Sequence, residues 1–138
     1  MQPSRPKIVL DTNTLVGSAY AASSASRRIV EDCLGGELMA ILSPALRREY
    51  ERILDRAVRR SGYAEALRRL IDQATVVEPT ETPRIAADDP EDDKLLAVAL
   101  AAGADAIITS DRHLLGLDPF GMVRILRPVE FVRCWLRH

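Results

Sequence analysis

Acidic side chains follow two short apolar runs, and their positions suggest chemistry on phosphate. Asp11 directly follows the run 7–10, and Asp111 comes just beyond the run 106–109. Carboxylates that lie close together repel, so each needs a proton or a cation at neutral pH. Mg²⁺ or Mn²⁺ suits such oxygen ligands and also accepts phosphate oxygens. A metal held there lowers the pKa of a bound water for attack on a phosphodiester, so no protein nucleophile is required.

Further carboxylates are expected near the beginnings of two helices. Asp92 and Asp93 fall in the first turn of the helix that Asp89-Pro90 begins. Glu49 lies about one and a half turns into the helix that Ser43-Pro44 begins, near enough for its longer side chain to reach the same place. Neighbouring residues on a helix point about 100° apart, so only one of Asp92 and Asp93 can be central. We favour Asp93 as the residue that binds the metal, and we expect Asp92 to support the binding residues without contacting the metal itself.

Strands and helices are predicted to alternate along the chain. Short β-branched runs predict buried strands over 7–10, 38–42, 75–77, 106–109 and 123–126. Helical spacing and capping residues predict helices over 24–34, 43–59, 63–73, 89–103 and 128–136, with a helical turn at 112–115 and a loop over 78–88. This order predicts an α/β fold, a three-layer α/β/α sandwich around a mainly parallel sheet. Ligands of such sheets bind beyond the carboxyl ends of the strands, where Asp11 and Asp111 are expected.

Composition predicts a single domain over residues 1–138. The chain has 47% hydrophobic residues, and its 19 basic and 20 acidic residues give a net charge of -1, which argues neither for nor against a nucleic-acid partner. The segment 47–69 contains eight arginines, which can bind a phosphate backbone or simply form the solvent face of a helix. No export signal or membrane span is evident, so a cytoplasmic location is expected. Cys33 and Cys134 are interpreted as reduced packing residues.

Four segments together resemble the PIN domain family. They are Val9-Leu-Asp-Thr-Asn-Thr-Leu-Val16, Leu42-Ser-Pro-Ala-Leu-Arg-Arg-Glu-Tyr50, the stretch 89–101 (DPEDDKLLAVALA), and Ala106-Ile-Ile-Thr-Ser-Asp111. The resemblance runs from about Ile8 to Phe131 and is greatest to the VapC-like branch, the toxin components of toxin–antitoxin systems. It implies a metal-dependent endoribonuclease with RNA as substrate, inhibition by a small antitoxin protein, and a homodimer.

The resemblance also implies roles for individual residues. The catalytic and metal-binding residues would be Asp11, Glu49, Asp93 and Asp111, with Mg²⁺ or Mn²⁺ as the cofactor. Asn13, Asp92 and Thr109 would support them, since hydrogen bonds from Asn13 and Thr109 can orient Asp11 and Asp111.

Structural interpretations of these residues stay open beside the catalytic one. Asp11 can cap a loop, Asp111 can cap the turn 112–115, and Asn13 and Thr109 can satisfy loop hydrogen bonds. His113 is expected to be an ordinary surface or packing residue. Phe131 and Trp135 are expected in the core or at a dimer contact.

Alternative functions also stay open. A phosphohydrolase of the haloacid-dehalogenase type would use Asp11 as its nucleophile, although Asn13 cannot act as the acid which that chemistry requires. A receiver-like signalling domain would need a lysine near a late strand, where residues 123–127 offer only arginine. A PIN fold that binds RNA or an antitoxin without cleavage is the third alternative.

Overall fold

A five-stranded, wholly parallel sheet forms the centre of the computed structural model, which describes residues 5–58, 62–80 and 90–135. The strands are β1 (Lys7–Leu10), β2 (Met39–Leu42), β3 (Thr75–Val76), β4 (Ala106–Ile108) and β5 (Arg124–Leu126). Their order across the sheet is β3-β2-β1-β4-β5. β1 pairs with β2 on one side and with β4 on the other, in a register that sets Leu10 beside Ile108. The last residues of β1 and β4 therefore lie side by side.

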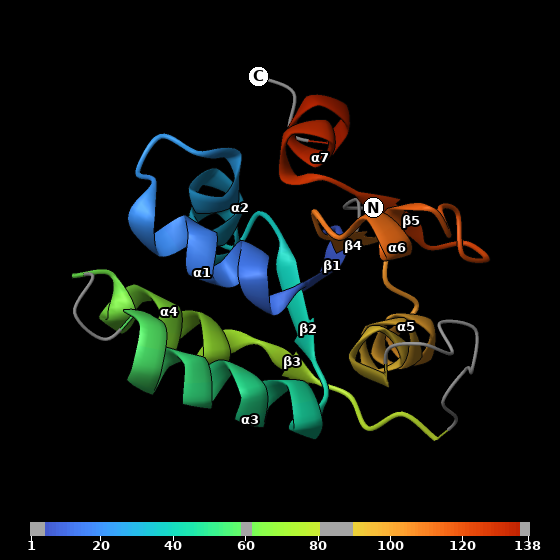
Figure 1. The fold of residues 1–138 in the computed structure, drawn as a ribbon, viewed down its shortest axis with the longest axis horizontal. Helices are drawn as coiled ribbons and strands as arrows, with labels where there is room; N and C mark the ends of the chain where they lie inside the picture. The colour runs from blue at the N-terminus through green and yellow to red at the C-terminus, as the bar shows by residue number, and fades with distance from the viewer. Residues whose placement is uncertain (1–4, 59–61, 81–89, 136–138) are drawn as a thin grey trace.

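Helices flank the sheet and complete the predicted layers. They are α1 (Thr12–Tyr20), α2 (Ala25–Leu34), α3 (Pro44–Ile53) with the π-helix η1 (Leu54–Val58), α4 (Ala64–Gln73), α5 (Pro90–Ala102), α6 (Arg112–Leu115) and α7 (Pro128–Trp135). α5 packs against β1, β2 and β4, whereas α1, α2 and α4 lie on the other side of β1 and β2 (Figure 1). The α/β fold predicted from the alternation of elements is confirmed. None of the described helices is long and apolar enough to cross a bilayer.

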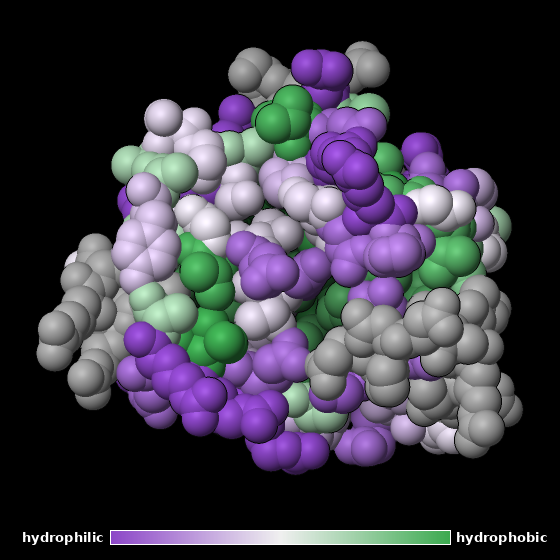
Figure 2. All heavy atoms as spheres, viewed as in Figure 1, coloured by the Kyte–Doolittle hydropathy of each residue, from purple (hydrophilic) through white to green (hydrophobic). Residues whose placement is uncertain are grey.

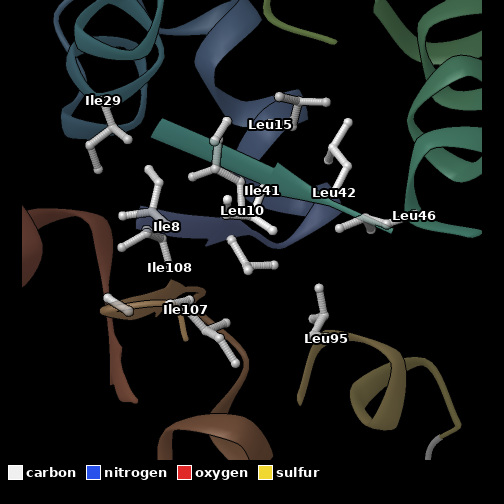
Figure 3. Packing of buried hydrophobic residues seen from close by; sticks show 14 of the residues in the cluster. Ile8, Leu10, Leu15, Ile29, Ile41, Leu42, Leu46, Leu95, Ile107 and Ile108 are labelled. Carbon is white, nitrogen blue, oxygen red and sulfur yellow. The ribbon is translucent and has the colours of Figure 1, made fainter. Parts of the chain in front are cut away.

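Aliphatic side chains from the sheet and the helices form one continuous core. Ile8, Val9 and Leu10 are all nearly inaccessible, as expected of a central parallel strand covered on both faces. Leu15 and Ile29 approach from one side of the strands and Leu95, on α5, from the other (Figure 3). This packing fixes the strand ends from which the candidate site is built.

Capping residues begin and end several helices where the sequence predicts. The side chains of Ser24 and Ser43 accept hydrogen bonds from the backbone N–H groups of Arg27 and Leu46, each at 3.1 Å. Gly103 follows α5 with a φ of 63°, a backbone conformation that glycine adopts without strain. Residues 81–88 of the predicted loop 78–88 lie outside the described residues, and so does the proposed helix cap at Asp89.

The structure differs from the sequence predictions at two helices. Residues 12–20 form α1, which was not predicted. The single helix expected over 43–59 is α3 up to Ile53 and then the wider π-helix η1, while residue 59 lies outside the described part. Both differences lie close to the predicted site, since α1 begins directly after Asp11 and α3 carries Glu49.

One prediction about packing residues, that for Cys134, is corrected at α7. Cys33 is buried and free as expected, but Cys134 is exposed and therefore is not a core residue. Phe131 is fully buried, whereas Trp135 remains 37% exposed and stacks on the Phe131 ring at a centroid distance of 5.8 Å. One side of α7 thus reaches the core, and the last turn lies at its margin.

Candidate active site

Thr109 connects the carboxylate of Asp11, which follows β1, to the backbone of Asp111, which follows β4. Its hydroxyl donates to Oδ2 of Asp11 at 2.6 Å and accepts from the backbone N–H of Asp111 at 3.0 Å. The Asp11 N–H in turn donates to the carbonyl of Ile108 at 3.0 Å, which continues the pairing of the two strands by one residue. Thr109 is completely buried, so these contacts hold its hydroxyl in one place. The strand ends thus bring Asp11 and Asp111 to one edge of the sheet, as predicted from the sequence.

Both of these aspartates also cap helices. Oδ1 of Asp11 accepts the N–H of Asn13 at 2.9 Å at the start of α1, and Oδ1 of Asp111 accepts the N–H of His113 at 2.8 Å at the start of α6. The cap interpretation of Asp111 is therefore confirmed, whereas Asp11 caps a helix instead of a loop. Capping does not compete with a second role, because a carboxylate has two oxygens and several lone pairs. The caps fix the direction in which each carboxylate points.

Glu49 lies between two other elements of the fold. Its Oε2 accepts a hydrogen bond from the hydroxyl of Thr12 at the start of α1. Its Oε1 lies 4.0 Å from Nζ of Lys94 on α5. The Glu49 side chain is 23% exposed, so the ion pair is only partly accessible to water. Through this carboxylate, α3 is connected both to the residue that follows Asp11 and to the helix that carries Asp92 and Asp93.

The pKa of the buried Tyr50 hydroxyl is influenced by carboxylates at this edge of the sheet. Its hydroxyl donates to the carbonyl of Leu10, the last residue of β1, and the side chain is fully buried. Burial raises the pKa of Tyr50 well above its usual value, and the nearby carboxylates of Asp11 and Glu49 raise it further. Asp11 and Glu49 therefore act on the same buried hydroxyl although they come from different elements.

The remaining predicted residues differ in their accessibility. Asp92 is 4% exposed and Asp93 is half-buried, so the second of the two is the more accessible to a ligand. The Asn13 side chain is exposed, and it is the backbone of this residue that contacts Asp11. His113 is exposed, as expected of a surface residue.

The donor set of this edge is chemically suited to a hard divalent cation. The side chains are carboxylates, which Mg²⁺ and Mn²⁺ prefer, and Mg²⁺ commonly takes only one or two of them together with waters and substrate phosphates. Asp11 and Asp111, connected through Thr109, supply such a pair. Over residues 5–58, 62–80 and 90–135, no group of three or more His, Cys, Asp or Glu side chains is arranged to hold a metal by itself.

Sequence reasoning missed three residues that make these connections. Thr12 and Lys94 contact Glu49, and Tyr50 contacts β1. The position of Lys94 could have been noticed in the sequence, because this lysine directly precedes the apolar stretch 95–99, where the helix enters the core. The roles of Thr12 and Tyr50 depend on how α1 and α3 are placed against the sheet, and no local pattern indicates that placement.

Comparison with known proteins identifies the class to which this fold and site correspond. A family model described as the PIN domain matches residues 7–113, and the chain belongs to the PIN domain family. PIN domains are generally nucleases and typically use divalent metals, which supports a hydrolase that acts on nucleic acids.

A solved structure shares this fold. The chain is similar to PAE2754 from Pyrobaculum aerophilum, with a TM-score of 0.62 and 17% sequence identity over 96% of this chain and 92% of that one. At this identity the likeness concerns the fold. A comparison with curated protein sequences gave no significant match.

Proposed function

We propose that this protein is a metal-dependent endoribonuclease that hydrolyses RNA phosphodiesters at the edge of the sheet formed by the ends of β1 and β4. The observation that carries the proposal is the connection of Asp11 to Asp111 through the buried hydroxyl of Thr109. Capping alone does not require the contacts of Thr109, since Oδ1 of Asp11 and Oδ1 of Asp111 already accept the backbone N–H groups of Asn13 and His113.

Asp11 and Asp111 would hold Mg²⁺ or Mn²⁺, and Glu49 and Asp93, from α3 and α5, would act on waters of the ion or on the substrate. Such an ion supplies a water of lowered pKa and neutralises charge on the phosphate oxygens. Thr109 holds Asp11 in position through its donated hydrogen bond, and Asn13 does so through its backbone N–H. Asp92 is too buried to reach a substrate and supports the beginning of α5.

Lys94 and Thr12 orient the carboxylate of Glu49. Glu49 can then hold a water near the phosphate by a hydrogen bond and act on it as a general base. Lys94 offers positive charge to a phosphate oxygen. This arrangement stabilises negative charge that develops during hydrolysis without a covalent intermediate on the protein.

Cleavage of RNA by matched variants tests the proposal. The purified protein is incubated with structured RNA and Mg²⁺ or Mn²⁺, beside EDTA and the variants Asp11→Asn and Asp111→Asn. We expect cleavage that EDTA stops and that each variant reduces by two or more orders of magnitude. Equal cleavage by the wild type and Asp11→Asn would reject the mechanism. Hydrolysis of small phosphate esters with RNA left intact would favour the haloacid-dehalogenase alternative, and metal-independent RNA binding without cleavage would favour the non-catalytic PIN module.

We further propose that the enzyme is the toxin of a toxin–antitoxin pair, acts in the cytoplasm as a homodimer, and is inhibited by a small antitoxin protein. The support is the resemblance of two segments to the toxin branch of the family, 89–94 (DPEDDK) and 124–131 (RILRPVEF). Induced expression should arrest growth, and expression of Asp11→Asn at the same level should not. Light scattering of the purified protein tests the dimer, since a monomeric mass at micromolar concentration would reject it.

A further inference from the structure

A charged groove opens beside the candidate site on the outer side of α3. It has a volume of about 490 Å³, and its lining includes Ala45, Arg48, Glu51, Arg52, Asp55 and Lys94. Residues 45, 48, 52 and 55 recur at intervals of three and four, so they share one side of α3 and its continuation into η1. Hydrophilic side chains cover this region in Figure 2, at the lower edge of the view where Figure 1 shows α3.

The groove is more positive than its lining residues suggest. Its two acids are already paired with arginines that do not line it. Glu51 lies 3.8 Å from Arg47, and Asp55 lies 3.3 Å from Arg68. These exposed pairs contribute little stability, but each offsets a negative charge that would otherwise repel an anion.

Two arginines of the lining are available to a ligand. Arg48 and Arg52 are exposed and, among the described residues, neither forms a salt bridge. They stand one helical turn apart, about 6 Å along the axis of α3. Each guanidinium can donate two parallel hydrogen bonds to one phosphate group. This pair can therefore hold two phosphates of a chain that lies along the helix.

Lys94 joins this groove to the candidate site. The same ammonium group that lines the groove lies 4.0 Å from Oε1 of Glu49. A substrate chain that is cut near Glu49 must continue away from the site on each side of the cleaved bond. The groove offers one such path, with positive charge along it from Lys94 to Arg48 and Arg52.

We propose that Arg48 and Arg52 bind the phosphate backbone of single-stranded RNA on one side of the cleaved bond. The inference rests on the proposed ribonuclease function, because continuity with Glu49 is what favours RNA over an acidic protein segment. The groove would make binding depend on substrate length and salt, and it would read the backbone without distinguishing the bases.

The test uses two variants of equal charge. Arg48→Gln/Arg52→Gln removes the two groove cations, and Arg69→Gln/Arg133→Gln removes two exposed arginines from α4 and α7. Binding of a labelled single-stranded RNA is measured by fluorescence anisotropy in Ca²⁺ at several salt concentrations, and thermal unfolding checks that both variants fold. Each phosphate contact on a single strand contributes about 0.7 to the slope of log K against log salt, so loss of two contacts lowers the slope by about 1.4 and weakens binding about 25-fold at roughly 0.1 M salt.

Cleavage kinetics then separate this inference from the proposed function. For a long RNA, the groove variant should raise KM strongly with little change in kcat, whereas a dinucleotide too short to reach the groove should be cleaved as by the wild type. The control variant should match the wild type on both. Unchanged affinity and salt slope in the groove variant would overturn the groove proposal while cleavage that depends on Asp11 leaves the ribonuclease intact. Binding of a polyglutamate peptide, but not RNA, through Arg48 and Arg52 would also overturn it.

Discussion

The substitution Thr109→Val tests the connection between Asp11 and Asp111 with almost no change in side-chain volume. Valine replaces the hydroxyl by a methyl group, so Asp11 Oδ2 loses its 2.6 Å donor and the Asp111 N–H loses its 3.0 Å acceptor. The neighbouring caps from Asn13 and His113 remain. The variant therefore removes the bridge and leaves both carboxylates in the protein.

The expected loss of stability follows from the environment of the two partners. A hydrogen bond to a charged group contributes about 1.5–3 kcal/mol, and an unsatisfied buried N–H costs about 1–3 kcal/mol. Asp11 is only half-buried, so water can replace its lost donor in part. A net loss of about 2 kcal/mol leaves a domain of ordinary stability folded and lowers the urea midpoint by about 1 M.

Activity should fall further than stability explains, because the Asp11 carboxylate loses one of its two hydrogen bonds and the backbone that positions Asp111 loses its contact with Thr109. Loss of a residue that orients a metal ligand typically lowers metal affinity or activity by about 10- to 100-fold. We expect a decrease of about that size in kcat, and a higher Mn²⁺ concentration for half-maximal activity. Thr109→Ser keeps the hydroxyl and should restore most of the rate. The reasoning would be refuted if Thr109→Val cleaved RNA with the wild-type rate and Mn²⁺ dependence, or if Thr109→Ser were as impaired as the valine variant.

Other predictions concern groups outside this bridge. Burial raises the pKa of Cys33 to about 12, so native protein at neutral pH should show one fast-reacting thiol, Cys134, and two after unfolding, as counted with a thiol reagent. Burial keeps Tyr50 protonated in the folded state, so the free energy of unfolding should decline above about pH 10 as the unfolded chain releases this proton, and Tyr50→Phe should show a smaller decline in urea titrations. The hydrogen bond from Arg124 lowers the pKa of Asp118, so the ionised Asp118 stabilises the fold fully above about pH 4, and this stabilisation is lost as the pH falls further. The free energy of unfolding of Asp118→Asn should therefore depend less on pH in acid, and an unchanged acid transition would contradict this contribution.

Much of the fold could be predicted because capping and hydrophobic patterns agree locally. Ser24 and Ser43 begin helices as expected, and each predicted strand is present within a residue or two. α1 escaped prediction because its residues lack a clear apolar period and include Gly17 and Ser18. Its only strong signal is Asp11, whose capping role is easily attributed to a loop. The π-helix after Ile53 has no comparable local signal.

The candidate site could be predicted in part, for a topological reason. Carboxyl ends of parallel strands share an edge, so Asp11 and Asp111 were expected together before the strand order was known. The contacts of Glu49 with Thr12 and Lys94 depend on the rotation and approach of three separate helices. Sequence spacing gives the direction of a side chain relative to its own helix, but it does not give the position of that helix against its neighbours.

Binding of Mn²⁺, followed by electron paramagnetic resonance without RNA, tests the central claim most directly. The wild type should bind Mn²⁺ at millimolar concentration or below, and Asp11→Asn and Asp111→Asn should each weaken that binding at least tenfold while unfolding at nearly the wild-type temperature. The exposed carboxylate variant Glu65→Gln, on α4, should bind as the wild type does. No uptake by the wild type, or equal uptake by all four proteins, would contradict a metal site at the ends of β1 and β4.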